Sequence, residues 1–511
     1  MSLAATPTQT AGLPEPCSVH DLKTLVLSRH PAIVIETTDE GRADAQLAAV
    51  ASDTGLTVFD WTITQGLVRQ PGTQAMYGTT DPALMLANLA GLTVPGLFVL
   101  KDFSVHLSAP AVCRAFRELL ERFADAPSQL STFVRLGASV ELPAEIESEI
   151  VRYDLRLPDR DEYRQAIGAV VESLQANGRA EVALRPGDYD AFASALSGLT
   201  INQARQAIAQ VAIEDGRLAP DDLTRIIDLK SRVLRNDSLL EYFPVADNGF
   251  ELGGFANLRR WLARARLAFT PEAAALNLPA PKGVLLVGVQ GCGKSLAAKV
   301  ISREWQQPLL KLDAGRLYDK YIGESEKKLR QSLTTAESMA PVILWIDEIE
   351  KGIAPGGGGD ADGGLSQRLF GSFLTWLQEK RADVFVVATA NDLSALPPEL
   401  LRKGRFDEIF FVDLPDPAER ATILGIHLRL RKQDPARFDL PRIAAAADGF
   451  SGAELEQVVI SALLRSIQER RPLDTQLLLD ELAATVPLSR SRREDIDRLR
   501  ALAKDRFVPA R

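Results

Sequence analysis

Gly288-Val-Gln-Gly-Cys-Gly-Lys-Ser295 lies between an apolar run, residues 284–287, and a helical pattern that begins at residues 296–301. A glycine-rich loop between a strand and a helix turns its backbone N–H groups toward phosphates, and the helix dipole adds to that attraction. In such a loop Lys294 reaches the β- and γ-phosphates, and the Ser295 hydroxyl binds Mg²⁺. The stretch therefore predicts an α/β fold with a nucleoside triphosphate site. The alternative is a glycine-rich turn that carries a lysine by chance.

The composition sets outer limits on the fold and its partners. At 511 residues the chain exceeds one hydrophobic core, so two or three domains are expected. The net charge of −9 and the lack of a basic stripe argue against nucleic acid as a partner. Three isolated cysteines indicate no disulfide framework and fit a reducing cytoplasm. No apolar run reaches the length of a membrane span, and the four histidines form no metal-ligand cluster.

Two further apolar runs end in polar side chains of the kind that hydrolysis requires. Residues 341–346 precede Asp347 and Glu348. Asp347 would hold Mg²⁺ through its water shell, and Glu348 would polarise the attacking water. Residues 384–390 precede Asn391, whose amide would orient that water or, alternatively, would favour the following turn. Together the three runs predict hydrolysis of ATP with Mg²⁺.

The string Leu401-Arg-Lys-Gly-Arg-Phe-Asp407 completes a set of motifs with the order and spacing of the AAA ATPases, which this half of the chain resembles. The resemblance implies that Arg402 and Arg405 enter the nucleotide site of a neighbouring copy. It also implies a homo-oligomeric ring, most often a hexamer. An arginine supplied in this way contributes roughly 10³ to 10⁵ in rate. The alternative is that Arg405 pairs with Asp407 on a turn.

The same resemblance implies three more nucleotide contacts. They come from Glu251-Leu-Gly-Gly-Phe255, where Glu replaces the usual Asp, from Ile426-His427, and from Phe450-Ser-Gly-Ala453. The expected nucleotide-binding residues are Leu252, Gly253, Gly288, Val289, Gln290, Gly291, Cys292, Gly293, Lys294, Ser295, Leu296, His427, Gly452 and Ala453. The expected catalytic residues are Lys294, Glu348, Asn391, Arg402 and Arg405, and the expected metal-binding residues are Ser295 and Asp347.

One segment indicates how the energy of ATP hydrolysis is used, and it is Lys320-Tyr-Ile-Gly-Glu-Ser-Glu326. In ring-forming AAA proteins that unfold other proteins, an aromatic-apolar-Gly loop lines the central pore. The resemblance gives Tyr321 and Ile322 that role, because an aromatic ring offers a large contact to many peptide sequences. The alternative is that Tyr321 packs within its own domain. The glycine-rich residues 355–364 are either a second pore loop or a plain linker.

Short segments of the first half repeat segments of the second half in the same order. The five matched pairs are 33–35 with 285–287, 95–100 with 341–346, 142–145 with 396–399, 157–162 with 414–419, and 198–200 with 449–451. Five matches in one order predict an internal duplication, although an unrelated α/β domain with similar turns is an alternative.

The first copy lacks the residues of the predicted chemistry. Glu36-Thr-Thr-Asp-Glu-Gly-Arg42 stands in place of the glycine-rich loop, and its acids would repel a triphosphate. Lys101 replaces Asp347, and Ser148 stands near the position of Arg402. We therefore expect the first copy to be a scaffold or recognition layer that does not hydrolyse ATP.

These patterns predict tandem P-loop AAA modules, each with a parallel sheet flanked by helices and a small helical lid. The expected bounds are a tail at 1–15, a degenerate α/β subdomain at 16–160 with its lid at 161–235, a catalytic α/β subdomain at 236–416, and a lid with a further helix at 417–511. Residues 236–250 are expected to be the linker between the modules.

Most of the chain is similar to an AAA family encoded in algal plastids and cyanobacteria as ycf-type open reading frames, with relatives in other bacteria. The resemblance implies a ring that remodels or threads a protein substrate. In the cyanobacterial relatives it implies a regulatory role in photosynthesis and inorganic-carbon uptake. The alternative is an ATP-controlled scaffold with little translocation. A nucleic-acid motor is disfavoured by the acidic charge, and a peptidase is disfavoured because no His-Glu-x-x-His segment follows the ATPase.

Cys292 offers two interpretations. The helix N-terminus and Lys294 beside it would lower the pKa of the thiol and make it oxidisable. Alternatively, Cys292 is a small residue that the loop tolerates.

Overall fold

The computed structural model describes residues 18–511, except 93, 126–129, 138–139, 141, 179, 238, 245–250, 314–321, 353–364, 381, 403 and 505. Two compact units are present. One contains the residues up to Leu157 together with Thr200–Gln203, and the other contains Pro158–Leu199 and Ala204–Arg511. Among the described helices, none combines the length and the apolar character that crossing a membrane requires.

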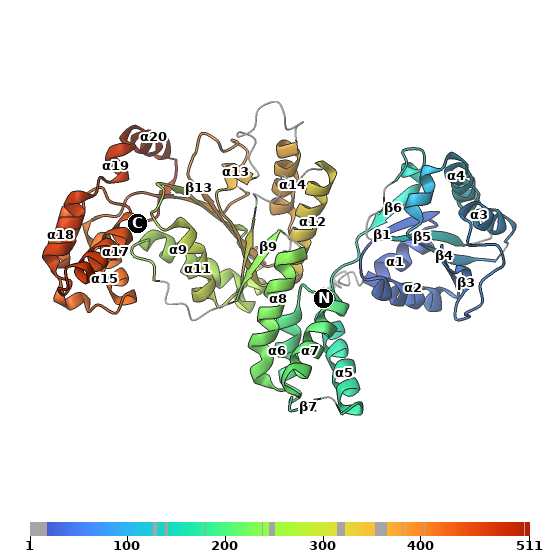
Figure 1. Cartoon of the computed structure of the whole chain (residues 1–511). Helices are drawn as coiled ribbons and strands as arrows, with labels where there is room; N and C mark the ends of the chain where they lie inside the picture. Colours follow the sequence, from blue (N-terminus) through green and yellow to red (C-terminus); the bar gives the residue numbers. More distant parts are fainter. Residues whose placement is uncertain are drawn as a thin grey trace, which may run out of the picture. The chain divides into compact units, whose positions relative to one another are not determined.

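The first unit is a sheet with helices on both faces (Figure 1). Its strand order is β3-β2-β4-β5-β1-β6, and β3 alone is antiparallel to its neighbour. One apolar cluster joins the sheet to α1 and α2, and another joins the opposite face to α3 and α4. The strands are β1 (Ala32–Glu36), β2 (Thr57–Thr62), β3 (Gly66–Arg69), β4 (Gly96–Lys101), β5 (Ser131–Gly137) and β6 (Ile150–Tyr153). The helices are α1 (Ser18–Leu27), α2 (Glu40–Thr54), α3 (Pro82–Gly91) and α4 (Pro110–Asp125), with short 3₁₀ turns at Phe103–Ser108 and Glu147–Glu149.

A helical segment follows the first sheet. Its helices are α5 (Arg160–Ala176), α6 (Asp188–Leu196), α7 (Ile201–Asp215) and α8 (Leu223–Asp237), with the short parallel strands β7 (Glu181–Val182) and β8 (Arg217–Leu218) and a 3₁₀ turn at Pro220–Asp222. Asp159 and Glu162 form a capping box at the start of α5, which fixes where this segment begins.

The second sheet has the strand order β15-β14-β10-β13-β12-β11-β9, with β9 antiparallel. Its central strands are continuous apolar runs because helices cover both faces. Figure 1 shows α9 and α11 against one face and α12 and α14 against the other. The strands are β9 (Leu240–Phe243), β10 (Gly283–Gly288), β11 (Leu309–Leu312), β12 (Val342–Ile346), β13 (Val384–Ala390), β14 (Glu408–Val412) and β15 (Val508–Pro509). The helices are α9 (Ala256–Ala265), α10 (Pro271–Ala275), α11 (Lys294–Trp305), α12 (Ile322–Ser338), α13 (Ile349–Gly352) and α14 (Leu365–Glu379), with a 3₁₀ turn at Arg266–Phe269.

A helical lid follows β14 and has its own apolar core. Its elements are α15 (Pro417–Leu430), a 3₁₀ turn at Pro435–Arg437, α16 (Leu440–Ala446), α17 (Gly452–Gln468) and α18 (Thr475–Ala484), and after them come α19 (Leu488–Ser491) and α20 (Arg493–Ala503). The predicted strands at 284–287, 341–346 and 384–390 and the helix after the loop are thereby confirmed.

Two sequence expectations are wrong. The predicted linker at 236–250 contains strand β9, whose buried Leu240 and Tyr242 complete the edge of the second sheet. The segment predicted as a lid with a further helix at 417–511 does contain that helix, as α20, but Val508–Arg511 return from it to the sheet. In both places a short segment pairs with a strand that lies far away in the sequence, β11 for β9 and β14 for β15.

Candidate active site

The glycine-rich loop joins β10 to α11 and is held by its own lysine. Lys294 is buried and donates from Nζ to the carbonyl oxygens of Gly288 and Val289, at 2.8 Å each. Gly291 and Gly293 have φ values of 73° and 89°, which favour glycine. Burial lowers the pKa of Lys294 to about 8. The loop carbonyls therefore bind the Lys294 ammonium, a positive charge to which a phosphate would be attracted.

The predicted metal-binding side chains meet at the end of β12. Ser295 Oγ donates to Asp347 Oδ1 at 2.8 Å. A third group joins them, because Thr389 Oγ1 donates to the same carboxylate oxygen at 2.6 Å. Hydroxyl and carboxylate oxygens are suitable ligands for Mg²⁺ or its water shell. The donor set therefore fits the metal that the sequence predicts.

Glu348 is oriented by groups from two elements. Its backbone lies in the left-handed region, with φ of 48°, and its N–H donates to Thr389 Oγ1 at 3.0 Å. Asn391 Nδ2 donates to Glu348 Oε1 at 2.8 Å. Lys351 Nζ lies 2.7 Å from the other carboxylate oxygen. The side chain of Asn391 thus contacts the predicted base.

Glu350 holds the backbone of Asn391. Its Oε1 accepts a hydrogen bond from Asn391 N at 2.8 Å, and burial raises the pKa of the Glu350 carboxyl. Glu348 and Asn391 are therefore fixed to each other by a side-chain contact and by a neighbouring acid.

The segment 251–255 lies between the loop and the lid. A side-chain carbon at Gly253 would come within 2.7 Å of Ile423, and one at Gly254 within 2.2 Å of Glu419. Glu251 forms an ion pair with Arg429 of α15, at 2.6 Å. The two glycines therefore permit a close approach of this backbone to the lid.

The start of α17 touches the glycine-rich loop directly. Ala453 N donates to Gly291 O at 2.9 Å, and a side-chain carbon at Gly452 would lie 3.2 Å from the same oxygen. Burial lowers the pKa of His427, whose Nδ1 lies 3.7 Å from the carboxylate of Glu456. These contacts explain why small residues are found at 452 and 453.

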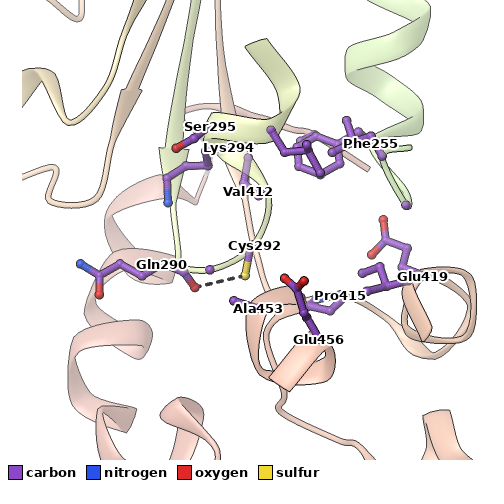
Figure 2. Close-up of a pocket in the computed structure, with 18 of the residues that line it drawn as sticks. Phe255, Gln290, Cys292, Lys294, Ser295, Val412, Pro415, Glu419, Ala453 and Glu456 are labelled. Atoms are coloured by element: carbon purple, nitrogen blue, oxygen red, sulfur yellow. Dashed lines mark hydrogen bonds between the residues drawn. The ribbon is translucent and has the colours of Figure 1, made fainter. Parts of the chain in front are cut away.

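A cavity of about 650 Å³ lies between the loop, the ends of β12 to β14 and the lid. Figure 2 shows the side chains of Lys294, Cys292, Phe255 and Glu419 around it. Of the predicted nucleotide-binding residues, Gly288 and Val289 are not in its lining. The predicted residues that line it are Leu252, Gly253, Gln290, Gly291, Cys292, Gly293, Lys294, Ser295, Leu296, Asp347, Glu348, Asn391, His427, Gly452 and Ala453.

The lining residues that lie outside every predicted site segment are Thr389, Val412, Asp413, Pro415, Glu419, Ile423, Leu430, Glu456, Ala510 and Arg511. Thr389 lies two residues before Asn391 near the end of a predicted strand, and this position indicates a side chain close to the site. Ala510 and Arg511 lie about a hundred residues beyond β14 in the sequence, and no local pattern indicated them.

Arg402 and Arg405 do not line this cavity. Asp407 instead binds the backbone N–H of Gly283 at 2.8 Å, and no ion pair joins Arg405 to a described residue. Arg405 Nη1 is buried without a hydrogen-bond partner among the described residues. The alternative in which Arg405 pairs with Asp407 is therefore not observed. Tyr321 lies outside the described residues, and of Ile322 only the backbone, at the start of α12, is described.

The expectation of a lowered thiol pKa at Cys292 is wrong. Burial raises the pKa of this thiol to about 12 and outweighs the opposing effect of Lys294. The Sγ atom donates to Gln290 O at 3.6 Å, and a dashed line marks this contact in Figure 2. Cys292 is thus a small buried residue of the loop.

Comparison with known families matches four parts of the chain. Residues 284–414 match the ATPase family associated with various cellular activities (AAA), and residues 437–481 match the AAA+ lid domain. Residues 18–155 and 161–237 match the N-terminal and second domains of SpoVK-like AAA ATPases. The catalytic motifs all lie within the first of these matches, except for the segment 251–255 and the lid contacts.

Among individual proteins, two similar ones are uncharacterised AAA domain-containing proteins ycf46. That of Pyropia yezoensis is 35% identical over 95% of this chain and 97% of its own length. That of Guillardia theta is 36% identical over 94% of each chain. The proteasome-activating nucleotidase of Aeropyrum pernix is 39% identical over 38% of this chain and 48% of its own.

Proposed function

Because this chain belongs to the AAA ATPases, within the group of AAA domain-containing proteins ycf46, we propose that it hydrolyses ATP as a ring and remodels a protein substrate. One observation carries the hydrolytic part of the proposal. The Thr389 hydroxyl binds both Asp347 Oδ1 and the N–H of Glu348, and so links the metal-binding acid to the base. Asn391 holds that base from the other side.

The chemistry follows from the groups around the cavity. Lys294 and the loop N–H groups would bind the phosphates, and Ser295 with Asp347 would hold Mg²⁺, which would supply charge neutralisation. Glu348, oriented by Asn391, accepts a proton from the attacking water. Since phosphoryl transfer depends on positioning and charge neutralisation, these groups are sufficient for slow hydrolysis, and Arg402 and Arg405 of a neighbouring copy would accelerate it.

The proposal that a protein is the substrate rests on two supports. The proteasome-activating nucleotidase, whose name gives it a protein-degrading partner, is similar to the ATPase region of this chain. In addition, Tyr321 and Ile322 occupy the pore-loop position of the AAA resemblance. The second candidate function is an ATP-controlled scaffold, which the long first half with its own sheet favours.

A Glu348→Gln variant tests the hydrolytic role. It should bind ATP with the affinity of the wild type and lose turnover by at least about a hundredfold, because the amide cannot accept the proton of the water. ATP binding and phosphate release are measured on the same preparation. Turnover at the wild-type rate would remove Glu348 from the role of base. Proteins retained by this variant in the presence of ATP would identify the client.

A Tyr321→Ala variant separates remodelling from scaffolding. The basal ATPase rate should remain within about twofold, since the resemblance gives Tyr321 a substrate contact and no nucleotide contact, while unfolding of a retained client should stop. The matched control is Tyr321→Phe, which keeps the aromatic side chain and should unfold the client at the wild-type rate. An undiminished unfolding rate in Tyr321→Ala would favour the scaffold.

We further propose that the first unit is an AAA-like module without nucleotide chemistry. Counted along the chain, the first five parallel strands of both sheets have the order 5-1-4-3-2 followed by an antiparallel edge strand, and β15 is an additional strand beside β14 in the second sheet. Asp102 follows β4 with φ of 53°, and Glu348 follows β12 with φ of 48°. A left-handed backbone is rare in residues other than glycine, so its recurrence at the same point of the two sheets supports a shared origin.

Contacts at the corresponding loop of the first unit support the absence of ATP binding there. Only three residues separate β1 from α2, which leaves little backbone to surround a triphosphate. Lys101 binds Asp44 at 2.6 Å and lies 3.5 Å from Glu40, so its charge is neutralised by α2. The full chain should therefore bind one nucleotide per copy, and Lys294→Ala should bind none. Isothermal titration gives the stoichiometry, and a remaining site in the Lys294→Ala chain would contradict the proposal.

A further inference from the structure

The residues after α20 return to the second sheet and reach the nucleotide cavity. Val508 and Pro509 form strand β15 beside β14, and Ala510 N donates to Phe411 O at 2.9 Å. Ala510 is 3% exposed and belongs to the apolar cluster that also contains Val289 and Cys292 of the glycine-rich loop. This segment is therefore packed into the core around the loop.

The carbonyl of Ala510 caps the helix that follows the base-binding segment. Helix α9 begins after Phe255, whose side chain has no oxygen to accept hydrogen bonds from the first turn. Ala510 O takes that role, accepting from Asn257 N at 3.1 Å and Leu258 N at 3.2 Å. Asn257 Nδ2 in turn donates to Pro509 O at 3.0 Å. The position of α9 relative to the cavity thus depends on residues 509–510.

Arg511 contacts the connection between β14 and α15, residues 413–416, which joins the sheet to the lid and is called the hinge below, and it also contacts the first turn of α15. Its Nη2 donates to Leu414 O at 2.5 Å and lies 3.5 Å from Asp413, at the end of β14. Its Nε lies 3.8 Å from Glu419, in the first turn of α15. One guanidinium therefore connects the hinge to the first helix after it.

The charge of Arg511 matters because the cavity wall is acidic. The described lining contains the carboxylates of Glu251, Asp347, Glu348, Asp413, Glu419 and Glu456, whereas its lysine and arginine residues are Lys294 and Arg511. Arg511 lies against two of these acids. Without it, Asp413 would keep Arg500, which binds it at 2.9 Å, but no other ion pair of Glu419 is found among the described residues. A polyanionic ligand would then face uncompensated negative charge.

We propose that residues 508–511 are part of the nucleotide site and that Arg511 is a positioning residue for triphosphate binding. It neutralises Glu419 and Asp413 at the cavity wall and fixes the hinge that brings α15 and α17 to the glycine-rich loop. The inference rests on the proposed ATPase activity, and it assigns a role in nucleotide affinity to a segment outside the AAA and lid matches.

The test compares Arg511→Ala with the wild type of the full chain. The dissociation constant of a fluorescent ATP analogue should rise about tenfold, while kcat at saturating ATP changes less than about threefold, because the reacting groups stay in place. Arg511→Lys keeps the charge and should recover most of the affinity. The matched control is Arg506→Ala, an exposed arginine in the same segment, which should bind like the wild type.

A second variant separates charge from folding. In Arg511→Ala with Glu419→Gln, the affinity should return to within about threefold of the wild type, since the amide keeps the capping box but no longer repels phosphate. If Arg511→Ala melts below the assay temperature, Arg511→Gln replaces it with the same expectations. Wild-type affinity in the single variant, or no recovery in the double variant, would overturn the inference. Failure of the wild type to bind ATP would instead overturn the proposed function.

Discussion

The hydroxyl of Thr389 contacts both acidic residues that follow β12. It donates to Asp347 and accepts from the backbone of Glu348, so it fixes a side chain and a strained turn at once. Thr389 is therefore a positioning residue of the proposed hydrolysis.

Replacing Thr389 by Val should lower kcat by about 10- to 100-fold with a change of less than about threefold in ATP affinity, because the shape is kept but both hydrogen bonds are lost. Thr389→Ser, which keeps the hydroxyl, is the matched control and should retain most of the rate. Steady-state kinetics and ATP titration measure the two quantities. A Val variant with full kcat would show that Asp347 and Glu348 are held without Thr389.

The buried amine of Lys294 predicts a pH dependence of ATP binding. Its pKa in the folded protein is about 8, below the ordinary 10.5, and a bound phosphate would raise it. Below about pH 8, Lys294 is already charged when ATP binds. Above that pH, ATP binding requires Lys294 to take up a proton. The affinity should therefore fall as the pH rises from 8 toward 10.

Titration of the Glu348→Gln protein with ATP at pH 7, 8, 9 and 9.5 checks the expectation without turnover. The dissociation constant should increase by about threefold or more between pH 8 and 9.5. Lys294→Arg, which stays charged over this range, is the control and should show a flatter profile. Equal profiles would assign the pH dependence to another group.

At the scale of elements, capping boxes mark where the helical parts of the second unit begin. Asp416 with Glu419 starts the lid, as Asp159 with Glu162 starts α5, and Ser451 with Glu454 starts α17. The first two of these motifs account for the match of 157–162 with 414–419 between the two halves of the sequence. The match of 33–35 with 285–287 is out by one residue, however. Ile33 and Ile35 pack with α2, whereas Val284 and Leu286 pack with α11.

The junction of α8 and β9 contains an unusual buried lysine. Lys230 is 1% exposed, its Nζ lies 4.7 Å from the ring centre of Tyr242, and burial lowers its pKa to about 7. Since the ordinary value is 10.5, the folded state binds fewer protons than the unfolded state between pH 7 and 10.5. The buried amine therefore destabilises the folded state by its full amount below pH 7, and this destabilisation decreases to zero as the pH rises to 10.5.

A Lys230→Met variant should be more stable than the wild type, because the thioether has a similar length and needs no charge to be desolvated. The unfolding midpoint at pH 6.5 should rise by about 3 °C or more, and the gain should shrink at pH 9.5. Arg232→Met, which removes an exposed charge two residues away, is the control and should have little effect. A gain that is independent of pH would contradict a charge-based explanation.

At the scale of the whole molecule, the site described here lacks the two arginines that the resemblance assigns to it. Arg402 is exposed and Arg405 half-buried, and neither lines the cavity of its own chain. If a neighbour supplies them, a chain with an intact cavity and a chain with intact arginines complement each other. This complementation distinguishes a shared site from a site that works alone.

Mixing Arg402→Ala chains with Lys294→Ala chains should therefore restore part of the ATPase rate that each lacks alone. In a random mixture about a quarter of the interfaces pair an intact cavity with an intact arginine, so recovery to roughly a quarter of the wild-type rate is expected. Mixed assemblies are verified with two affinity tags. Mixed rings that stay as inactive as the separate variants would count against a shared site.

The sequence alone was sufficient to predict the strands, the loop and the helix around Lys294, since apolar periods, glycines and caps act over a few residues. It also predicted the residue types around the cavity, because phosphate and Mg²⁺ restrict which side chains can bind them. Only the tertiary structure decided that Thr389 meets Asp347, that Leu240–Phe243 form an edge strand, and that Ala510 and Arg511 reach the cavity. Strand order and register bring these groups together across tens to hundreds of residues, and no local pattern specifies such pairings.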